Sequence, residues 1–86
     1  MTIMWYVYLL ECGDGSYYCG STTDVTRRFQ QHCNGVGAKY TRGRGPLRLL
    51  GSVGPIASQS KAQIIESKIK AIPHERKLQA LFKSLN

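Results

Sequence analysis

Four of the five tyrosines in the chain lie within Tyr6 to Gly20, YVYLLECGDGSYYCG. Aromatic and aliphatic runs on either side of Gly-Asp-Gly predict the two strands of a hairpin. A three-residue loop would place Tyr8 and Tyr18 on one sheet face, about 7 Å apart, whereas a two-residue loop would separate them onto opposite faces. We expect the longer loop, with Tyr8 and Tyr18 available for chemistry and Tyr6 and Tyr17 packing the sheet.

Arg28 and His32 bring a cation and a proton carrier to the segment after the hairpin. STTDVTRRFQQHCNG predicts a helix that begins within Thr-Thr-Asp and ends at Asn-Gly. Its apolar stripe is Val25, Phe29 and Cys33. Arg28 and His32 are spaced i, i+4 and lie about 60° from that stripe. We therefore expect them at the margin of the buried face, with Arg27 pointing away.

A carboxylate, Glu66, falls on the apolar face of a later predicted helix. SQSKAQIIESKIKAIP predicts this helix, with a capping box at Ser60 and Gln63. Its buried stripe is Ala62, Ile65, Ile69 and Ile72. Glu66 lies about 40° from Ala62 on the helical wheel. An unpaired carboxylate in a core costs several kcal/mol, so Glu66 must meet a cation or a metal, or open onto a cleft.

Positive charge is concentrated in the middle of the chain. The net charge is +7, and no acidic residue occurs between Asp24 and Glu66. The glycine-rich segment NGVGAKYTRGRGP predicts an exposed loop able to bring backbone N–H groups and three cations to phosphates. Those cations are Lys39, Arg42 and Arg44. A polyanion, most simply nucleic acid, is the expected partner, and a surface tuned for solubility is the alternative.

The remaining elements complete an α+β fold. LRLLGSV, from Leu47 to Val53, predicts a third strand ended by Gly-Pro, and HERKLQALFKSLN predicts a final helix. The apolar stripe of that helix is Leu78, Leu81, Phe82 and Leu85. We expect one domain over residues 1–86, a small three-stranded antiparallel sheet flanked by helices in the order strand, strand, helix, strand, helix, helix. No apolar run approaches the ~18 residues of a membrane span.

The cysteines indicate a reducing compartment. Cys12, Cys19 and Cys33 are odd in number and lack paired CxxC spacing, so we expect them reduced and mostly buried. The N-terminus has no basic region typical of a signal peptide. These features favour the cytoplasm, or the nucleus in a eukaryote or its virus.

The order of these motifs resembles the GIY-YIG nuclease family over nearly the whole chain. The matching positions are Tyr6-Val7-Tyr8, Tyr18-Cys19-Gly20, Arg28, His32 and Glu66. The small stand-alone members, with a KYTRGRGP-like loop after the first helix, are the most similar. The resemblance implies a three-stranded antiparallel sheet flanked by helices, and hydrolysis of a phosphodiester by an activated water with one divalent metal.

The resemblance also implies a role for each site residue. Glu66 would hold Mg²⁺ or Mn²⁺, Arg28 would stabilise charge developing on the phosphate, and Tyr8, Tyr18 and His32 would orient or deprotonate the water. Hard cations prefer carboxylate oxygens, and guanidinium geometry suits phosphate. A phenol with a pKa of about 10 is a poor base at neutral pH unless a nearby cation or metal lowers that pKa. Histidine needs no such shift because its ordinary pKa is already near neutrality. A salt bridge from Arg28 to Glu66 would satisfy the carboxylate without metal and is the competing interpretation.

The chain departs from the family pattern at several positions. Tyr6 replaces a glycine, Cys19 replaces an isoleucine, and Ser21 stands where the excision-repair nucleases have lysine. Many members carry an asparagine in the helix after the glutamate helix, where this chain has only the terminal Asn86.

Together these observations predict a metal-dependent endonuclease of low intrinsic sequence specificity acting on DNA, with structure-selective cleavage in repair or recombination as its role. Arg27, Lys39, Arg42 and Arg44 are the expected DNA contacts. Duplex, branched and single-stranded substrates are not distinguished, nor is a dimer or partner subunit. The alternatives are a catalytically weak nucleic-acid-binding module of the same fold and an adaptor for a partner nuclease subunit.

Overall fold

The computed structural model describes residues 3–85, and its elements follow the predicted order. The strands are β1 (Trp5–Glu11), β2 (Tyr17–Thr22) and β3 (Arg48–Ile56), all antiparallel in the order β2-β1-β3. The helices are α1 (Val25–Cys33), α2 (Gln59–Lys70) and α3 (Lys77–Lys83), with short 3₁₀ turns η1 (Lys39–Thr41) and η2 (His74–Arg76). The predicted α+β class is confirmed. Asn86 lies outside the described residues.

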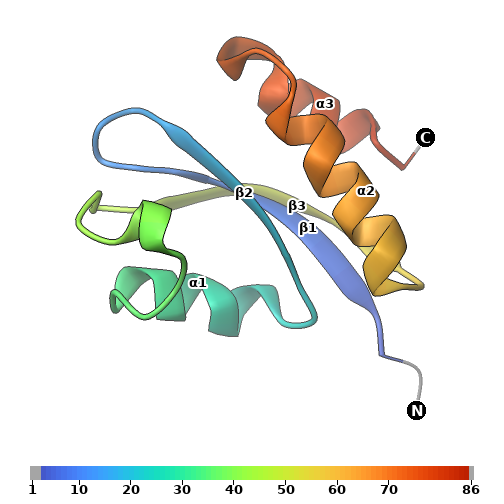
Figure 1. Cartoon of the computed structure of the whole chain (residues 1–86), viewed down its shortest axis with the longest axis horizontal. Helices are drawn as coiled ribbons and strands as arrows, with labels where there is room; N and C mark the ends of the chain where they lie inside the picture. Colours follow the sequence, from blue (N-terminus) through green and yellow to red (C-terminus); the bar gives the residue numbers. More distant parts are fainter. Residues whose placement is uncertain (1–2, 86) are drawn as a thin grey trace.

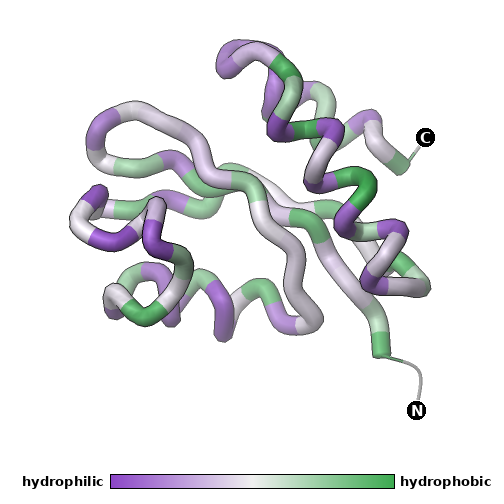
Figure 2. Tube along the Cα trace, in the orientation of Figure 1, coloured by the Kyte–Doolittle hydropathy of each residue, from purple (hydrophilic) through white to green (hydrophobic). Residues whose placement is uncertain are grey.

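The sheet separates two unequal helical layers. Figure 1 shows α1 and η1 on one side of the strands and α2 with α3 on the other. The main core lies on the α2 and α3 side and comprises Val7, Leu9, Cys19, Ile56, Ala62, Ile69 and Leu81. Hydrophobic and hydrophilic residues alternate along α2, as expected for a helix with one face packed on a sheet (Figure 2). None of the helices within residues 3–85 is long and apolar enough to cross a membrane.

The hairpin has the predicted three-residue loop. Leu10 pairs with Tyr18 and Tyr8 with Gly20, and the Cys12 N–H donates to the Ser16 carbonyl at 2.8 Å. The loop residue before Ser16 is glycine with φ +84°, a left-handed conformation that other residues adopt only with strain. This register puts Tyr8 and Tyr18 on the same face of the sheet.

The third strand is longer than predicted. β3 continues through Gly54 and Pro55 to Ile56, which pairs with Trp5. The predicted end at Gly54 is wrong because β3 is an edge strand, where a proline without an N–H can be accommodated. The pairing of β1 with β3 shifts register between Trp5 and Val7 of β1, and this shift accommodates the proline in β3.

The helix starts are only partly as predicted. α1 begins after Asp24, whose carboxylate accepts from the Arg27 N–H at 3.1 Å, as expected. The capping box at Ser60 is wrong, since the extended residue is Ser58 and its hydroxyl accepts from the Lys61 N–H at 3.2 Å. Sequence spacing could not choose between two serines in one turn.

The final apolar segment divides into η2 and α3 instead of forming one helix from His74. Leu81 is fully buried, but Phe82 and Leu85 are about half exposed. The short α3 therefore covers β3 through a narrower stripe than the sequence predicts.

Replacement of Gly15 tests the hairpin. Gly15→Ala should lower the free energy of unfolding by about 1 kcal/mol because alanine is strained at this positive φ. Gly15→Asn is the matched control, since asparagine tolerates the left-handed region better. Urea denaturation measures both, and equal stability of wild type and Gly15→Ala would contradict the loop.

Candidate active site

Three aromatic rings meet on the α1 side of the sheet. The Tyr8 and Tyr18 ring centroids are 6.4 Å apart, and the His32 ring lies 5.8 Å from Tyr8 and 5.2 Å from Tyr18. Two strands of one hairpin and the last turn of α1 supply them. The structure therefore brings together the three residues that the sequence analysis selected as candidates for positioning a water.

A chain of hydrogen bonds runs through His32. Tyr8 Oη lies 2.8 Å from His32 Nε2, and His32 Nδ1 lies 2.8 Å from Thr41 Oγ1. The Thr41 hydroxyl donates its only proton to the Ala38 carbonyl at 3.0 Å, so it must accept from Nδ1–H. Nε2 then carries the lone pair and accepts from the Tyr8 hydroxyl. The Ala38 N–H also faces Nδ1, but at 3.4 Å this contact is the weaker indication of the tautomer.

His32 is buried, not marginal as predicted. Its exposed fraction is 2%, whereas Cys33, which the sequence analysis assigned to the buried stripe, is exposed. The face of α1 turned to the sheet instead carries Val25, Arg28, Phe29 and His32, at i, i+3, i+4 and i+7. Burial of the imidazole is tolerated because both ring nitrogens have hydrogen-bond partners.

Two glycines allow this close packing. A Cβ on Gly20 would lie 2.5 Å from Tyr8 Oη, and a Cβ on Gly37 would lie 2.8 Å from His32 Cγ. Gly20 belongs to the YCG motif, but the sequence analysis missed Gly37 and Thr41, which lie in the segment it interpreted as an exposed loop. Nothing in that segment's composition distinguishes the buried Thr41 from its exposed neighbours.

The surroundings set the protonation states of the three rings. Burial raises the pKa of Tyr8 to about 12, against the opposing effect of the Arg28 guanidinium. Burial also raises the pKa of Tyr18, and burial followed by the Arg28 charge lowers the pKa of His32. At neutral pH both phenols are protonated and His32 is neutral. The group that can take up a proton is therefore His32 Nε2, through the Tyr8 hydroxyl.

Arg28 and Glu66 flank the rings from different elements. Arg28 is half-buried on α1 and donates to Gln31 Oε1 at 3.0 Å. Glu66 comes from α2, with a side chain 20% exposed, and its charge acts on the pKa values of both Tyr8 and Tyr18. The site thus straddles the edge strand β2, with one carboxylate reaching it from the opposite layer.

The cation that pairs with Glu66 is Lys70. Lys70 Nζ lies 2.8 Å from Glu66 Oε2, one helical turn along α2. The competing interpretation paired Glu66 with Arg28, and no such ion pair occurs among residues 3–85. The sequence analysis missed Lys70, although its i, i+4 spacing from Glu66 is a recognisable signal.

The donor set suits only a water-rich metal ion. Within the described part of the chain, no three His, Cys, Asp or Glu side chains converge on a metal position. Glu66 offers one hard carboxylate, with Oε2 engaged by Lys70. Mg²⁺ and similar ions keep several waters and bind through one or two carboxylates, so Glu66 fits such an ion whereas an all-protein cage is absent here.

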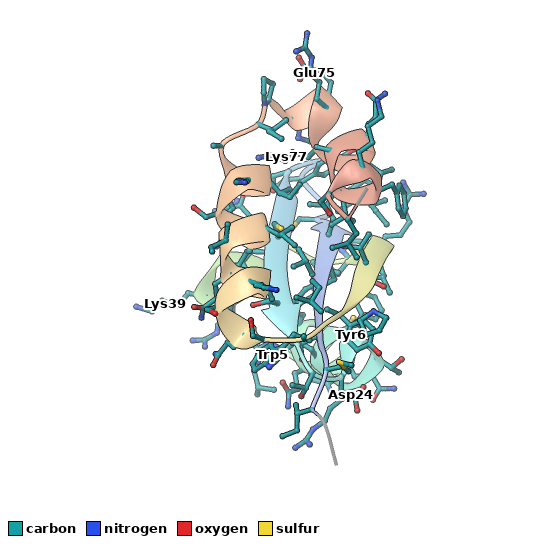
Figure 3. All side chains as sticks on the ribbon, turned by 90° about the vertical axis from the view of Figure 1, so that its right-hand side faces the viewer. Trp5, Tyr6, Asp24, Lys39, Glu75 and Lys77 are labelled. Carbon is teal, nitrogen blue, oxygen red and sulfur yellow. The ribbon has the colours of Figure 1, made fainter. Side chains whose placement is uncertain are left out.

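The other predicted cations lie on α1 and on the segment that follows it. Arg27 and Arg28 line a cavity of about 300 Å³ with Ser21 and Thr22 at the start of α1. Lys39 and Arg42 are exposed, and Lys39 projects from the outline of the molecule in Figure 3. Arg44 instead pairs with Asp14 at 2.7 Å.

Substitution of Gly20 tests the close approach to Tyr8. Gly20→Ala should push the Tyr8 hydroxyl away from His32, because the new methyl group would occupy its place. The imidazole ¹⁵N chemical shifts in an NMR spectrum should change accordingly. Gly51→Ala, which crowds Phe82, is the control, and unchanged His32 shifts in Gly20→Ala would contradict the packing.

Acid should destabilise the protein through His32. Its pKa in the folded state lies below the ordinary 6.5, so the unfolded chain takes up the proton first. The contribution of neutral His32 to the free energy of unfolding is complete above about pH 6.5. It is lost as the pH falls through the pKa that His32 has in the folded protein. The free energy of unfolding in urea should therefore decrease between about pH 7 and pH 5, and decrease less in His32→Gln. Equal decreases in the two proteins would refute this.

Comparisons with known proteins show the family of the chain. A family model described as the GIY-YIG catalytic domain matches residues 4–84. A UPF0213 protein of Cupriavidus pinatubonensis is 57% identical over 65 residues, which cover 76% of this chain and 69% of that protein. A UPF0213 protein of Halalkalibacterium halodurans is 50% identical over 74 residues, covering 86% of this chain and 78% of the relative.

Two solved structures are also similar. One is the solution NMR structure of the same UPF0213 protein of Halalkalibacterium halodurans, there called Bacillus halodurans, with 48% identity and a TM-score of 0.53, covering 95% of this chain and 84% of that one. The solution NMR structure of a protein from E. faecalis has 35% identity and a TM-score of 0.61, covering 93% and 84%. By sequence, motif order and fold, the chain belongs to the GIY-YIG family, with the small UPF0213 proteins among its relatives.

Proposed function

We propose that the protein is a metal-dependent endonuclease that hydrolyses DNA phosphodiester bonds with little sequence preference, in repair or recombination. The observation that carries the proposal is the 2.8 Å hydrogen bond between the Tyr8 hydroxyl and Nε2 of a buried, neutral His32. Arg28 and Glu66 lie at the same cluster. Membership of a nuclease family supports hydrolysis as the reaction.

The proton path follows from the pKa values. A free tyrosinate is unavailable at neutral pH because the pKa of Tyr8 is about 12. The attacking water instead gives its proton to Tyr8 Oη while the Tyr8 proton passes to His32 Nε2, so the phenol stays neutral. Thr41 accepts from Nδ1–H and holds the imidazole in the orientation that this transfer needs.

Arg28 and Glu66 act on the phosphate. The Arg28 guanidinium neutralises charge that develops on the phosphoryl oxygens as the water attacks. Glu66 would hold a hydrated Mg²⁺ or Mn²⁺, which would supply further neutralisation of the negative charge on the phosphate. The Tyr18 ring packs beside Tyr8 and His32 and helps to orient the water in this scheme.

The substrate is inferred from charge. A net charge of +7 and the exposed Arg27, Lys39 and Arg42 suit a polyanionic backbone. Contacts of this kind position a strand without reading its sequence, which agrees with low specificity. Arg44, tied to Asp14, would contribute by fixing the basic segment near the hairpin turn as well as by its charge.

Activity measurements on folded variants test the proposal. Wild type should nick DNA with Mg²⁺ or Mn²⁺ and lose activity with EDTA. Tyr8→Phe and Arg28→Ala should each lower kcat by about 100-fold or more, since one loses the proton path and the other the phosphate charge. Glu66→Gln should lose metal-dependent cleavage.

Glu75→Gln is the matched control for Glu66→Gln, because Glu75 is an exposed carboxylate on η2. The substrate panel should include single-stranded, duplex, flapped and branched DNA. If wild type cuts none of them with either metal but binds them with a steep salt dependence, the protein is a binding module and the proposal fails.

A further inference from the structure

A cavity of about 290 Å³ adjoins the candidate active site at the edge strand β2. Its lining residues are Tyr17, Tyr18, Cys19, Tyr40, Lys70 and Lys77. Two of them also belong to the candidate site: the Tyr18 ring lies beside Tyr8, and Lys70 pairs with Glu66. The cavity therefore adjoins the cluster that contains Tyr8, Tyr18 and Glu66.

The aromatic wall of the cavity is already in place without substrate. The Tyr18 and Tyr40 rings are stacked, with centroids 6.0 Å apart and planes 28° apart. Arg44 lies 4.3 Å from the centroid of the Tyr40 ring and is fixed by Asp14. The Gly13 N–H donates to the Arg44 carbonyl at 2.6 Å. A hairpin turn thus supports an aromatic side chain that is 40% exposed.

Two positioned cations border the same cavity. Lys70 Nζ bonds Glu66 and lies 5.9 Å from the Tyr18 centroid. Lys77 Nζ donates to the Ile69 and Lys70 carbonyls at 2.9 Å each, and Figure 3 shows Lys77 beside the end of α2. Among the described residues, these bonds leave Lys77 one ammonium hydrogen to donate and Lys70 two. Aromatic faces with nearby cations are the combination that binds bases and phosphates of an unpaired strand.

We propose that this cavity binds an unpaired nucleobase of the nucleotide next to the scissile phosphate. A base stacked inside a duplex cannot reach a pocket on the protein, so the substrate must be single-stranded, frayed or extrahelical at that nucleotide. The base packs against the Tyr18 and Tyr40 rings where they line the cavity, and the lysines contact the adjoining phosphate. This inference rests on the proposed function and specifies its substrate class.

Binding to overhangs with and without bases tests the cavity. Two fluorescent duplexes carry the same short overhang, one of thymidines and the other of abasic residues, and 5′ and 3′ overhangs are compared. In EDTA, where metal-dependent cleavage cannot proceed, wild type should bind the base-bearing overhang of one polarity about 5- to 150-fold more tightly, the range that loss of one base–aromatic stack produces. Fluorescence anisotropy measures the ratio.

Variants of cavity residues test whether the cavity causes this difference in affinity between the two duplexes. Tyr40→Leu should reduce the ratio to about one and Tyr40→Phe should preserve it, because a stack needs the ring and not the hydroxyl. Arg42→Gln is the control, and it should weaken both duplexes equally as a backbone contact. Thermal melting confirms that each variant is folded.

A wild-type ratio of about one for both polarities would overturn the inference, as would an unchanged ratio in folded Tyr40→Leu. A separate cleavage assay distinguishes this failure from failure of the proposed function. If the protein cleaves DNA but binds the two overhangs equally, the proposed nuclease function stands and the cavity is not a base site. If the protein never cleaves DNA but its binding ratio depends on Tyr40, the base site stands and the proposed nuclease function fails.

Discussion

The buried hydrogen-bond chain from Tyr8 through His32 to Thr41 is the constraint on which the rest of this layer depends. It joins the central strand, the end of α1 and η1, three elements that share little apolar surface. A buried donor or acceptor that loses its partner costs about 1–3 kcal/mol, so each member holds the other two. The same bonds that attach α1 to the sheet also orient the imidazole toward Tyr8, while burial and the nearby Arg28 charge keep it neutral.

That constraint explains features that otherwise look unrelated. Gly20 and Gly37 lack side chains where the two rings approach backbone, and any Cβ would occupy the space of the hydrogen-bonded atoms. Thr41 is buried inside a segment rich in glycine and arginine because His32 needs an acceptor there. The positive segment is consequently held against the site, with Arg44 bound to Asp14 of the hairpin turn as a second attachment.

Local rules were sufficient where one short segment decides the outcome. The Gly-Asp-Gly loop set the hairpin register, so Tyr8 and Tyr18 share a face as predicted, and α1 starts within the predicted Thr-Thr-Asp segment, with Asp24 as its cap. They failed where two segments compete or meet. The wheel of α1 favoured Cys33 over His32 because it counts apolar residues and cannot anticipate the polar partners that make a buried imidazole acceptable.

The sequence by itself determined the element order, the family and the five residues first selected as candidates for the site, because these follow from spacing along the chain. Only the tertiary structure decided that Glu66 pairs with Lys70 instead of Arg28, that Thr41 completes the hydrogen-bond chain, and that Tyr40 stacks on Tyr18 beside a cavity. These are contacts between side chains whose geometry depends on how two layers pack around one edge strand. Such pairing and burial depend on distances in space between residues far apart in the chain, and the spacing of residues along the sequence does not specify those distances.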